Sequence, residues 1–510
     1  MTPHTSSHRT AEETLALGYL GSILRSSGIE YIVIDGWFEG LNSHQIVERA
    51  TREGKPSLLC FSCYRSNLDE ARELLCLFHT EVGYIPSVCG GYGATFHDED
   101  FLDAGFTVVV RGEAEHIFLD LVKALEQELS LDSISGLTFR RDNRIVRTER
   151  TQPVQDLDGL LFPVRGLISR AIELRNPVHV CTSRGCMAHC VFCSVIAFAK
   201  GSAGSIWRYR SIENIVDELK MIANTYNVRD FKFVDDSFLE PPRNERWAEA
   251  FAEALCKRNL SIRFRTQVRA DRLTERIVTA LKQAGWFATS VGVENGSARA
   301  LHRMGKSATV EDNNRALALL KENEIYVQMG MILFDHATSM DELEENYVFL
   351  RSHDWVVTKG IFTEMFAALG TPFTQWLTNK KLAKAGKGNQ NVAYEIRDPA
   401  VYKVYALLKG WHRTHAPLYD WVIDSIGAPK ILPVEGYQRV HDLCVMLLKL
   451  DLSFFRKALD YVQSQQHGGE GLLEESVTSN AHQYSFIESR IAEIYRDYGL
   501  VYDGVLNPFL

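Results

Sequence analysis

The sequence has few cysteines for its length and no long apolar run. Ten cysteines among 510 residues are too sparse for a disulfide scaffold, so we expect free thiols in a reducing compartment. No stretch approaches the roughly 20 apolar residues that span a bilayer, and residues 1–10 lack the apolar segment of a signal peptide. We therefore expect a cytosolic protein without a membrane anchor.

The sequence also lacks an excess of basic residues, and it shows no internal repeat. Lys and Arg number 56 against 65 Asp and Glu, and the net charge of -9 argues against binding to nucleic acid. A small-molecule or peptide substrate is the expected partner instead. Hydrophobic residues at 45% and charged residues at 24% are typical of folded proteins, and the length suggests about three domains.

Short apolar runs alternate with helical patterns over the first part of the chain. Strands are predicted at 31–35, 57–62, 85–88 and 107–110, and helices at 12–27, 43–53 and 67–82. This alternation predicts a doubly wound, Rossmann-like domain over residues 1–150. Residues 151–175 contain Pro153 and Pro163 and have weak periodicity, which predicts a linker.

The alternation restarts at residue 176 with longer helices. Strands are predicted at 178–182, 230–234, 261–267, 288–293, 325–333 and 358–368, and helices at 211–225, 243–258, 273–284, 309–323 and 340–352. The pattern predicts a partial or full parallel α/β barrel over residues 176–375, with its chemistry at the carboxyl ends of the strands. Helical patterns at 401–411, 436–449 and 485–497 predict a mostly helical domain over 376–510.

Three cysteines follow the first predicted barrel strand with ligand spacing. Cys186, Cys190 and Cys193 form a C-x3-C-x2-C loop. Three thiolates suit iron, and iron–sulfur clusters are normally held by cysteine. Cys181 belongs to the strand, so a closed structural zinc site would need another ligand, such as His189. An iron–sulfur cluster with an open coordination position is the favoured interpretation.

With the aromatic Phe192 before its last cysteine, this loop resembles the signature of the radical S-adenosylmethionine (SAM) superfamily. The resemblance implies that the three cysteines hold a 4Fe-4S cluster whose fourth iron binds the amine and carboxylate of SAM. It implies that the backbone of Phe192 contacts the adenine. An external one-electron donor, such as flavodoxin or ferredoxin, is implied as a partner.

Further motifs after the predicted strands resemble elements of the same superfamily. The resemblance implies that Asp235 and Asp236 bind the methionine amine, that Arg269 pairs with the cofactor carboxylate, and that Glu294 reaches the ribose or sulfonium region. It continues through 301–306 and the turn at 370–372. Taken alone, each of these residues could instead be a helix cap or a structural ion pair.

The segment 334–338 departs from the G-x-P-G-E-T sequence that many relatives have after the fifth strand. Its Asp335 and His336 are candidate substrate contacts or acid/base groups, and a structured turn would explain them equally well. In the tail, Trp411 and His412 either shape the substrate pocket or belong to the core. No catalytic residue is assigned beyond these candidates.

The first 150 residues resemble the cobalamin-binding domain of one radical SAM subfamily. Ser62, Gly90, Gly91 and Gly93 are the implied cobalamin contacts, since glycines after a strand let the backbone approach a ligand closely. A generic Rossmann-like domain could show such a turn too. No D-x-H-x-x-G motif indicates a histidine ligand. The short polar segment 1–10 suggests either that the domain has lost its first strand or that the start is truncated.

The subfamily implies C-methylation of an unactivated carbon in a small-molecule or natural-product intermediate. One SAM methylates cob(I)alamin, and a second is cleaved to a 5'-deoxyadenosyl radical that takes hydrogen from the substrate. The alternative is a radical SAM enzyme with a relic cobalamin domain that uses one SAM for dehydration, epimerisation or rearrangement. A third possibility is an electron-transfer or sensor protein. Neither the substrate nor the oligomeric state follows from the sequence.

Overall fold

The chain forms two compact units. The computed structural model describes residues 1–3, 13–199, 205–358, 360–386, 392–426, 431–464 and 469–500. The first unit comprises Met1–Ser169, Ser194–Ser211 and Gly386–Asn391, and the second comprises Arg170–Cys193, Ile212–Ala385 and Val392–Leu510. The second unit holds most of the predicted barrel and most of the predicted helical tail, whereas residues 194–211 belong to the first unit. The domain boundaries at 150, 175 and 375 stay a prediction.

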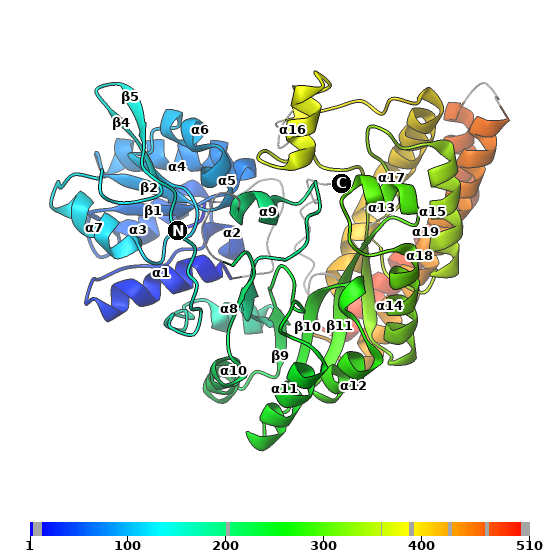
Figure 1. Ribbon diagram of the computed structural model, residues 1–510, viewed down its shortest axis with the longest axis horizontal. Helices are drawn as coiled ribbons and strands as arrows, with labels where there is room; N and C mark the ends of the chain where they lie inside the picture. Colours follow the sequence, from blue (N-terminus) through cyan, green and yellow to red (C-terminus); the bar gives the residue numbers. More distant parts are fainter. Residues whose placement is uncertain are drawn as a thin grey trace. The chain divides into compact units, whose positions relative to one another are not determined.

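A five-stranded sheet in the order β1-β2-β3-β4-β5 forms the centre of the first unit (Figure 1). Strands β1 (Leu59–Ser62), β2 (Ser87–Gly90) and β3 (Val108–Val110) are parallel, as the alternation with helices predicts. Its helices are α1 (Leu15–Ser26), α2 (Gly36–Glu39), α3 (Ser43–Thr51), α4 (Leu68–Glu81), α5 (Tyr92–Phe96), α6 (Asp98–Asp103), α7 (Phe118–Glu126) and α9 (Ser194–Ala199). Helix α8 (Ile168–Glu173) lies at the boundary with the second unit.

An antiparallel hairpin, absent from the predicted elements, extends this sheet. It consists of β4 (Leu137–Arg141) and β5 (Arg144–Arg147), and β4 pairs with β3. Asp142 and Asn143 form its turn with φ of 49° and 60°. Asp and Asn tolerate positive φ in two-residue hairpin turns, so this pair was the available sequence signal.

The predicted strand at 31–35 does not form a ladder, and the first two residues pair beside it. Thr2 bridges Asp35, and its N–H donates to the carbonyl of Ile34 at 3.0 Å. On the other side, the N–H of Ser62 donates to the carbonyl of Met1 at 2.9 Å. Met1 and Thr2 therefore lie between segment 34–36 and β1 and pair with both. They occupy the place of the first strand, which the sequence suggests is missing.

The second unit contains a five-stranded parallel sheet in the order β12-β11-β10-β9-β6. Its strands are β6 (Val178–Val180), β9 (Asp230–Phe233), β10 (Arg263–Arg269), β11 (Trp286–Glu294) and β12 (Tyr326–Met331). Each predicted helix between them is present: α10 (Ile212–Tyr226), α11 (Glu245–Lys257), α12 (Glu275–Gln283), α14 (Val310–Glu322) and α15 (Met340–Ser352). The short helix α13 (Ala298–Arg303) follows β11.

One face of this sheet is apolar and the other is polar, because side chains alternate along each strand. On the apolar face, Phe233 stacks on Phe264 at 4.8 Å and both contact Phe251 of α11. On the opposite face, Arg265 is the register partner of Lys232. The apolar face therefore packs against the helices. The charged residues of the strands lie on the other face and do not interrupt this packing.

The sixth predicted barrel strand, 358–368, is not a regular strand. Isolated bridges join Gln328 to Val357 and Phe334 to Glu364, so this segment follows β12 without a continuous ladder. Helix α17 (Pro399–Ile426) packs beside it, with the His412 ring 3.8 Å from that of Phe362. Helices α18 (Val434–Gln463) and α19 (Gly469–Asp497) complete the helical tail, which is visible in Figure 1.

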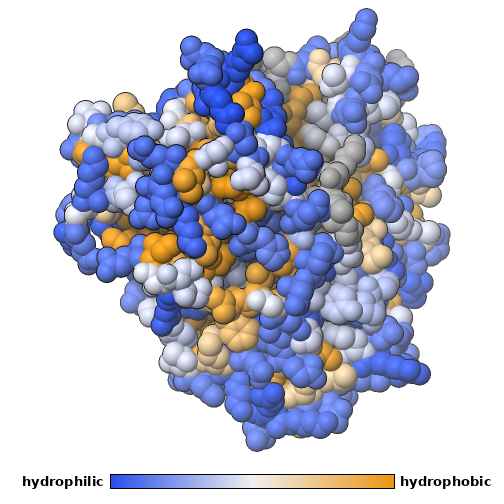
Figure 2. Space-filling model, turned by 60° about the vertical axis from the view of Figure 1, so that its left-hand side comes forward, coloured by the Kyte–Doolittle hydropathy of each residue, from blue (hydrophilic) through white to orange (hydrophobic). Residues whose placement is uncertain are grey.

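The predicted α/β fold class, with a Rossmann-like domain, a partial parallel barrel and a helical tail, is confirmed. None of the helices in the described part of the chain combines the length and the apolarity needed to cross a membrane. The face of the molecule in Figure 2 mixes hydrophilic residues with patches of hydrophobic ones. The surface therefore carries exposed apolar side chains, as most folded proteins do.

The helical tail buries a polar cluster around Asp451 of α18. Trp411 Nε1 donates to Asp451 Oδ1 at 2.9 Å, and the hydroxyl of Tyr419 donates to the same oxygen. His412 is also buried and stacks on Tyr419 at 4.3 Å. Trp411 and His412 thus belong to the core of the tail. Burial raises the pKa of Asp451 to about 7, although the two hydrogen bonds lower it.

This raised pKa makes the stability of the tail depend on pH. Between about pH 4 and pH 7, the folded chain holds a proton on Asp451 that the unfolded chain releases, so the free energy of unfolding falls as pH rises. Asp451→Asn keeps an acceptor for both donors and removes the charge. We expect its melting temperature to exceed that of the wild type at pH 8 by several degrees, and by less at pH 5.5, in calorimetry.

The matched control is Asp442→Asn on the same helix, because Asp442 is exposed. This variant should follow the wild type at both pH values. If Asp451→Asn had the same pH dependence as the wild type, Asp451 would not titrate in this range.

Candidate functional site

The cysteine loop lies at the carboxyl end of β6, after the short strand β7 (Ser183–Arg184). Cys186 and Cys190 are buried, and Cys193 is half-buried. The loop is fixed to the barrel by its backbone. The N–H of Val191 donates to the carbonyl of Met304, and the N–H of Phe373 donates to the carbonyl of Val191, both at 2.9 Å.

The chemistry of this loop fits an iron–sulfur cluster, because Cys186, Cys190 and Cys193 supply three free thiols on one loop. In a 4Fe-4S cluster each cysteine thiolate binds a different iron. Burial raises the pKa of Cys186 to about 11 and also raises that of Cys190. Bound metal would favour the thiolates that the protein alone disfavours.

A buried carboxylate, Glu240, connects the cysteine loop to β10. The Cys186 thiol donates to Glu240 Oε1 at 3.4 Å, and Arg269 Nη1 donates to the same oxygen at 3.2 Å. Arg272 Nε donates to Glu240 Oε2 at 3.1 Å. The sequence motifs do not single out Glu240, although it stands four residues after the aspartate pair. Tertiary contacts alone identify it.

Arg269 occupies the predicted place at the end of β10. Besides Glu240, its guanidinium donates to both carboxylate oxygens of Asp271, at 3.0 and 2.7 Å. The structure therefore brings Arg269 next to the cysteine loop and pairs it with two carboxylates. Its contact with a cofactor carboxylate remains a proposal.

Asp235 and Asp236 both contact the segment that leads into the cysteine loop. The N–H of Thr182 donates to Asp235 Oδ1 at 2.6 Å, and its hydroxyl donates to Oδ2. Arg243, fully buried, pairs with Asp235 at 3.4 Å. Asp236 is exposed and accepts from the N–H of Gly185 at 2.9 Å. A ligand amine would compete with these donors at Asp235, whereas Asp236 faces solvent.

Glu294 ends β11 in a conformation that few side chains adopt. Its φ is 68°, and the pairing with β12 shifts between Gly292 and Glu294. Its Oε1 accepts from Lys306 Nζ at 3.1 Å, and the lysine side chain is only 7% exposed. Burial lowers the pKa of Lys306, but Glu294 and Cys190 raise it by more, so the ammonium form is favoured. Positive φ outside glycine is often retained at functional sites.

Phe192 is partly buried and packs against the hydrophobic cluster that includes Met304, Met365 and Phe373. Only its side chain is fixed by these contacts. Its backbone, which the resemblance places near adenine, belongs to the loop between Cys190 and Cys193.

Asp335 and His336 lie in a structured turn before α15. Arg303 Nε donates to Asp335 Oδ2 at 2.8 Å, and the N–H of Ala337 donates to Oδ1 at 2.7 Å. His336 Nδ1 is 2.6 Å from the carbonyl oxygen of Glu395. These contacts favour the structural interpretation of the turn, and an acid/base role for either residue stays a prediction.

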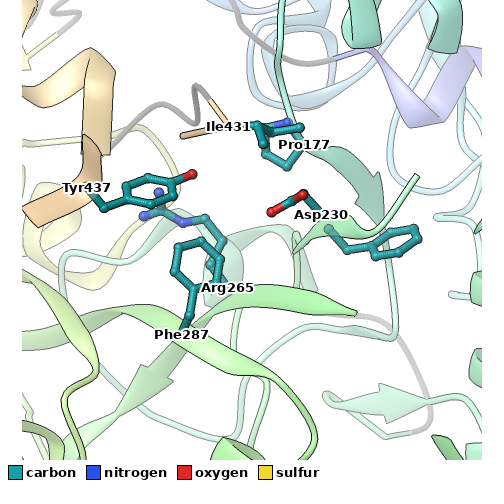
Figure 3. A pocket seen from close by; sticks show the side chains of 7 residues that line it. Pro177, Asp230, Arg265, Phe287, Ile431 and Tyr437 are labelled. Atoms are coloured by element: carbon teal, nitrogen blue, oxygen red, sulfur yellow. The ribbon is translucent and has the colours of Figure 1, made fainter. Parts of the chain in front are cut away.

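A small cavity lies at the opposite ends of the strands. Asp230 begins β9, and Arg265 and Phe287 lie near the starts of β10 and β11. Figure 3 shows Asp230 and Arg265 pointing into this cavity beside Tyr437 of α18. Because parallel barrels place their chemistry at the carboxyl ends, this cavity is not part of the candidate site.

The predicted cobalamin contacts lie at the carboxyl edge of the first unit's sheet. Ser62 ends β1 and Gly90 ends β2. The N–H of Gly93 donates to the carbonyl of Cys63 at 2.9 Å. A Cβ on Gly91 would lie 2.9 Å from that same oxygen, and one on Gly93 would lie 2.4 Å from the carbonyl carbon of Tyr64. The glycines therefore allow the two loops to touch, and their contact with cobalamin remains a proposal.

Comparisons with known families assign both regions. Residues 180–350 match the radical SAM superfamily and residues 6–122 match the B12 binding domain. The two matched segments contain the cysteine loop and the glycine loops. They imply a 4Fe-4S cluster, SAM and cobalamin as cofactors, as the sequence predicts, and radical SAM enzymes need an external electron donor.

Curated relatives are about one quarter identical to the chain over the aligned residues. The anaerobic magnesium-protoporphyrin IX monomethyl ester cyclase of Rubrivivax gelatinosus is 26% identical over 69% of this chain and 66% of its own length. An uncharacterized methyltransferase of Pyrococcus horikoshii is 27% identical over 68% and 74%. The 4'-phospho-dehydrooxetanocin synthase of Priestia megaterium is 27% identical over 67% and 48%. The matches thus span about half to three quarters of the relatives' lengths.

Solved structures share the fold. The cobalamin-dependent SAM radical enzyme OxsB with aqua-cobalamin bound superposes with a TM-score of 0.75 at 21% identity, over 97% of this chain and 80% of the other. The radical SAM methyltransferase TsrM from Kitasatospora setae gives 0.66 at 16% identity, over 92% and 97%. The chain thus contains a radical SAM domain over residues 180–350 and a B12-binding domain over residues 6–122, and it shares its fold with OxsB and TsrM.

Proposed function

We propose that the chain is a C-methyltransferase that acts on an unactivated carbon of a small-molecule or natural-product intermediate. The observation that carries the proposal is the presence of the three-cysteine loop and a B12-binding domain in one chain. Relatives described as methyltransferases support it, including the cytidylyl-2-hydroxyethylphosphonate methyltransferase of Streptomyces wedmorensis, which is 24% identical over 57% of this chain and 63% of its own length.

The residues of the chain would bind and orient the cofactors. Bound together, the cluster and cobalamin supply an electron for cleavage of SAM and a carrier for a methyl group. Cys186, Cys190 and Cys193 would hold the cluster. The proposed SAM contacts are Phe192, Asp235, Asp236, Arg269 and Glu294, and the proposed cobalamin contacts are Ser62, Gly90, Gly91 and Gly93. Asp335 and His336 remain the candidates for substrate contact.

A second candidate is a rearrangement or ring-forming reaction that uses one SAM. The relatives described as a cyclase and as 4'-phospho-dehydrooxetanocin synthase favour it. The two reactions differ in their products from SAM. Methyl transfer consumes one SAM to S-adenosylhomocysteine and one to 5'-deoxyadenosine, whereas the alternative forms only 5'-deoxyadenosine.

The first test is anaerobic purification with hydroxocobalamin, followed by iron analysis and product analysis with SAM and a strong reductant. We expect about four irons per chain, bound cobalamin, and both S-adenosylhomocysteine and 5'-deoxyadenosine. Cys190→Ala should lose most of the iron and all 5'-deoxyadenosine. Cys256→Ala is the matched control, because Cys256 is exposed on α11.

The outcomes separate the candidates. 5'-Deoxyadenosine without S-adenosylhomocysteine in cobalamin-loaded protein would contradict methyl transfer and favour the alternative. Unchanged iron in Cys190→Ala would contradict the assignment of the cluster ligands.

We expect Glu240 to stabilise the carboxyl ends of the barrel strands around the cysteine loop. Glu240→Ala removes the buried carboxylate that Arg269 and Arg272 share, although Arg269 keeps its pair with Asp271. Because the Arg272 side chain is 30% exposed, we expect the loss of a hydrogen bond to a charged group, which costs on the order of 2 kcal/mol. We expect a lower melting temperature and less retained iron. Glu249→Ala, which removes an exposed partner of Arg276, should change neither. Equal melting temperatures for the two variants would show that Glu240 contributes no more than a surface carboxylate.

A further inference from the structure

The first unit presents a row of aromatic rings at the carboxyl edge of its sheet. Trp37 follows segment 31–35, Tyr64 follows β1, and Tyr92 follows β2. The Trp37 and Tyr64 rings meet edge to face at 5.5 Å, and the Tyr64 and Tyr92 rings lie 6.5 Å apart and only 9° from parallel. Trp37 in α2, Tyr64 in the turn after β1 and Tyr92 at the start of α5 thus each place one ring at the edge where doubly wound sheets bind ligands.

Helix α9 extends this row. The Phe198 ring stacks on Tyr92 at 4.6 Å. We call Trp37, Tyr64, Tyr92 and Phe198 the aromatic shelf. Its members come from four separate segments of the chain. Packing within a single helix or strand therefore does not explain why these rings lie side by side.

Tyr64 combines an exposed ring with a fixed backbone. Its side chain is 49% exposed. Its N–H donates to Oδ1 of the buried Asn67 at 3.0 Å, and Gly93 packs directly against its carbonyl carbon. A large exposed ring held on a rigid loop loses little conformational entropy when a ligand covers it, so such residues are effective contacts for flat ligands.

We propose that the corrin ring of cobalamin packs against the Tyr64 and Tyr92 rings of the aromatic shelf. The adjacent glycine loops at 90–93 carry the proposed contacts for the same cofactor. Beside them, the exposed Tyr64 ring and the half-buried Tyr92 ring offer apolar surface that the hydrophobic part of a large macrocycle can cover. The inference rests on cobalamin binding, which the proposed function also needs, but not on methyl transfer.

The test measures the affinity of the full-length protein for hydroxocobalamin by equilibrium dialysis and visible absorption. Tyr64→Ala and Tyr92→Ala should each weaken binding by about tenfold, the loss typical of an aromatic contact. Tyr64→Phe keeps the ring and should bind within about threefold of the wild type. Tyr84→Ala is the matched control, because Tyr84 is 65% exposed in the same unit but precedes β2 at its amino end.

Each outcome bears on the proposal. Binding by Tyr64→Ala and Tyr92→Ala that equals binding by Tyr84→Ala would overturn it and leave the proposed function intact. A loss in Tyr64→Phe as large as in Tyr64→Ala would also overturn it, because the hydroxyl and not the ring would then be responsible. A wild-type protein that binds no cobalamin would overturn both the inference and the proposed function. Circular dichroism and iron content confirm that each variant is folded, and Tyr92→Ala tests the shelf independently of Tyr64.

Discussion

The edge of the barrel that carries the cysteine loop depends on the pairing of buried charges. Glu240 has no exposed side-chain surface, and it is held between Arg269 and Arg272 while it accepts from the Cys186 thiol. A buried carboxylate is tolerated only when it is paired and hydrogen-bonded. One acidic side chain therefore fixes the first cysteine, the end of β10 and the turn that follows it.

The same rule governs the neighbouring strand ends. Asp235 pairs with Arg243 and Glu294 pairs with Lys306, so the strand ends beside the cysteines carry ion pairs rather than isolated charges. These pairs keep the edge close to neutral, although it is rich in charged residues. A cluster with thiolate ligands would add negative charge here, and the Lys306 ammonium lies near enough to influence Cys190.

The connections between elements also organise the chain for two cofactors. The segment directly after Cys193 belongs to the first unit, where α9 contributes Phe198 to the aromatic shelf. The cysteine loop and the shelf are thus close in sequence although they belong to different units. At the other end of the barrel, Tyr437 of α18 covers the strand starts, which leaves the carboxyl ends as the place for chemistry.

The sequence by itself determined the parallel α/β architecture, the helical tail and the cysteine loop, because apolar periodicity and cysteine spacing are local patterns. It also located Arg269 and Glu294, which stand at strand ends in recognisable motifs. Only the tertiary structure decided the roles of Glu240 and Arg243. Glu240 accepts from Cys186, 54 positions away, and Arg243 donates to the carbonyl of Thr182, 61 positions away. The pairing of Met1 and Thr2 beside β1 and the alignment of Tyr64 with Tyr92 are likewise tertiary, since such contacts depend on which segments meet and leave no periodic signal along the chain.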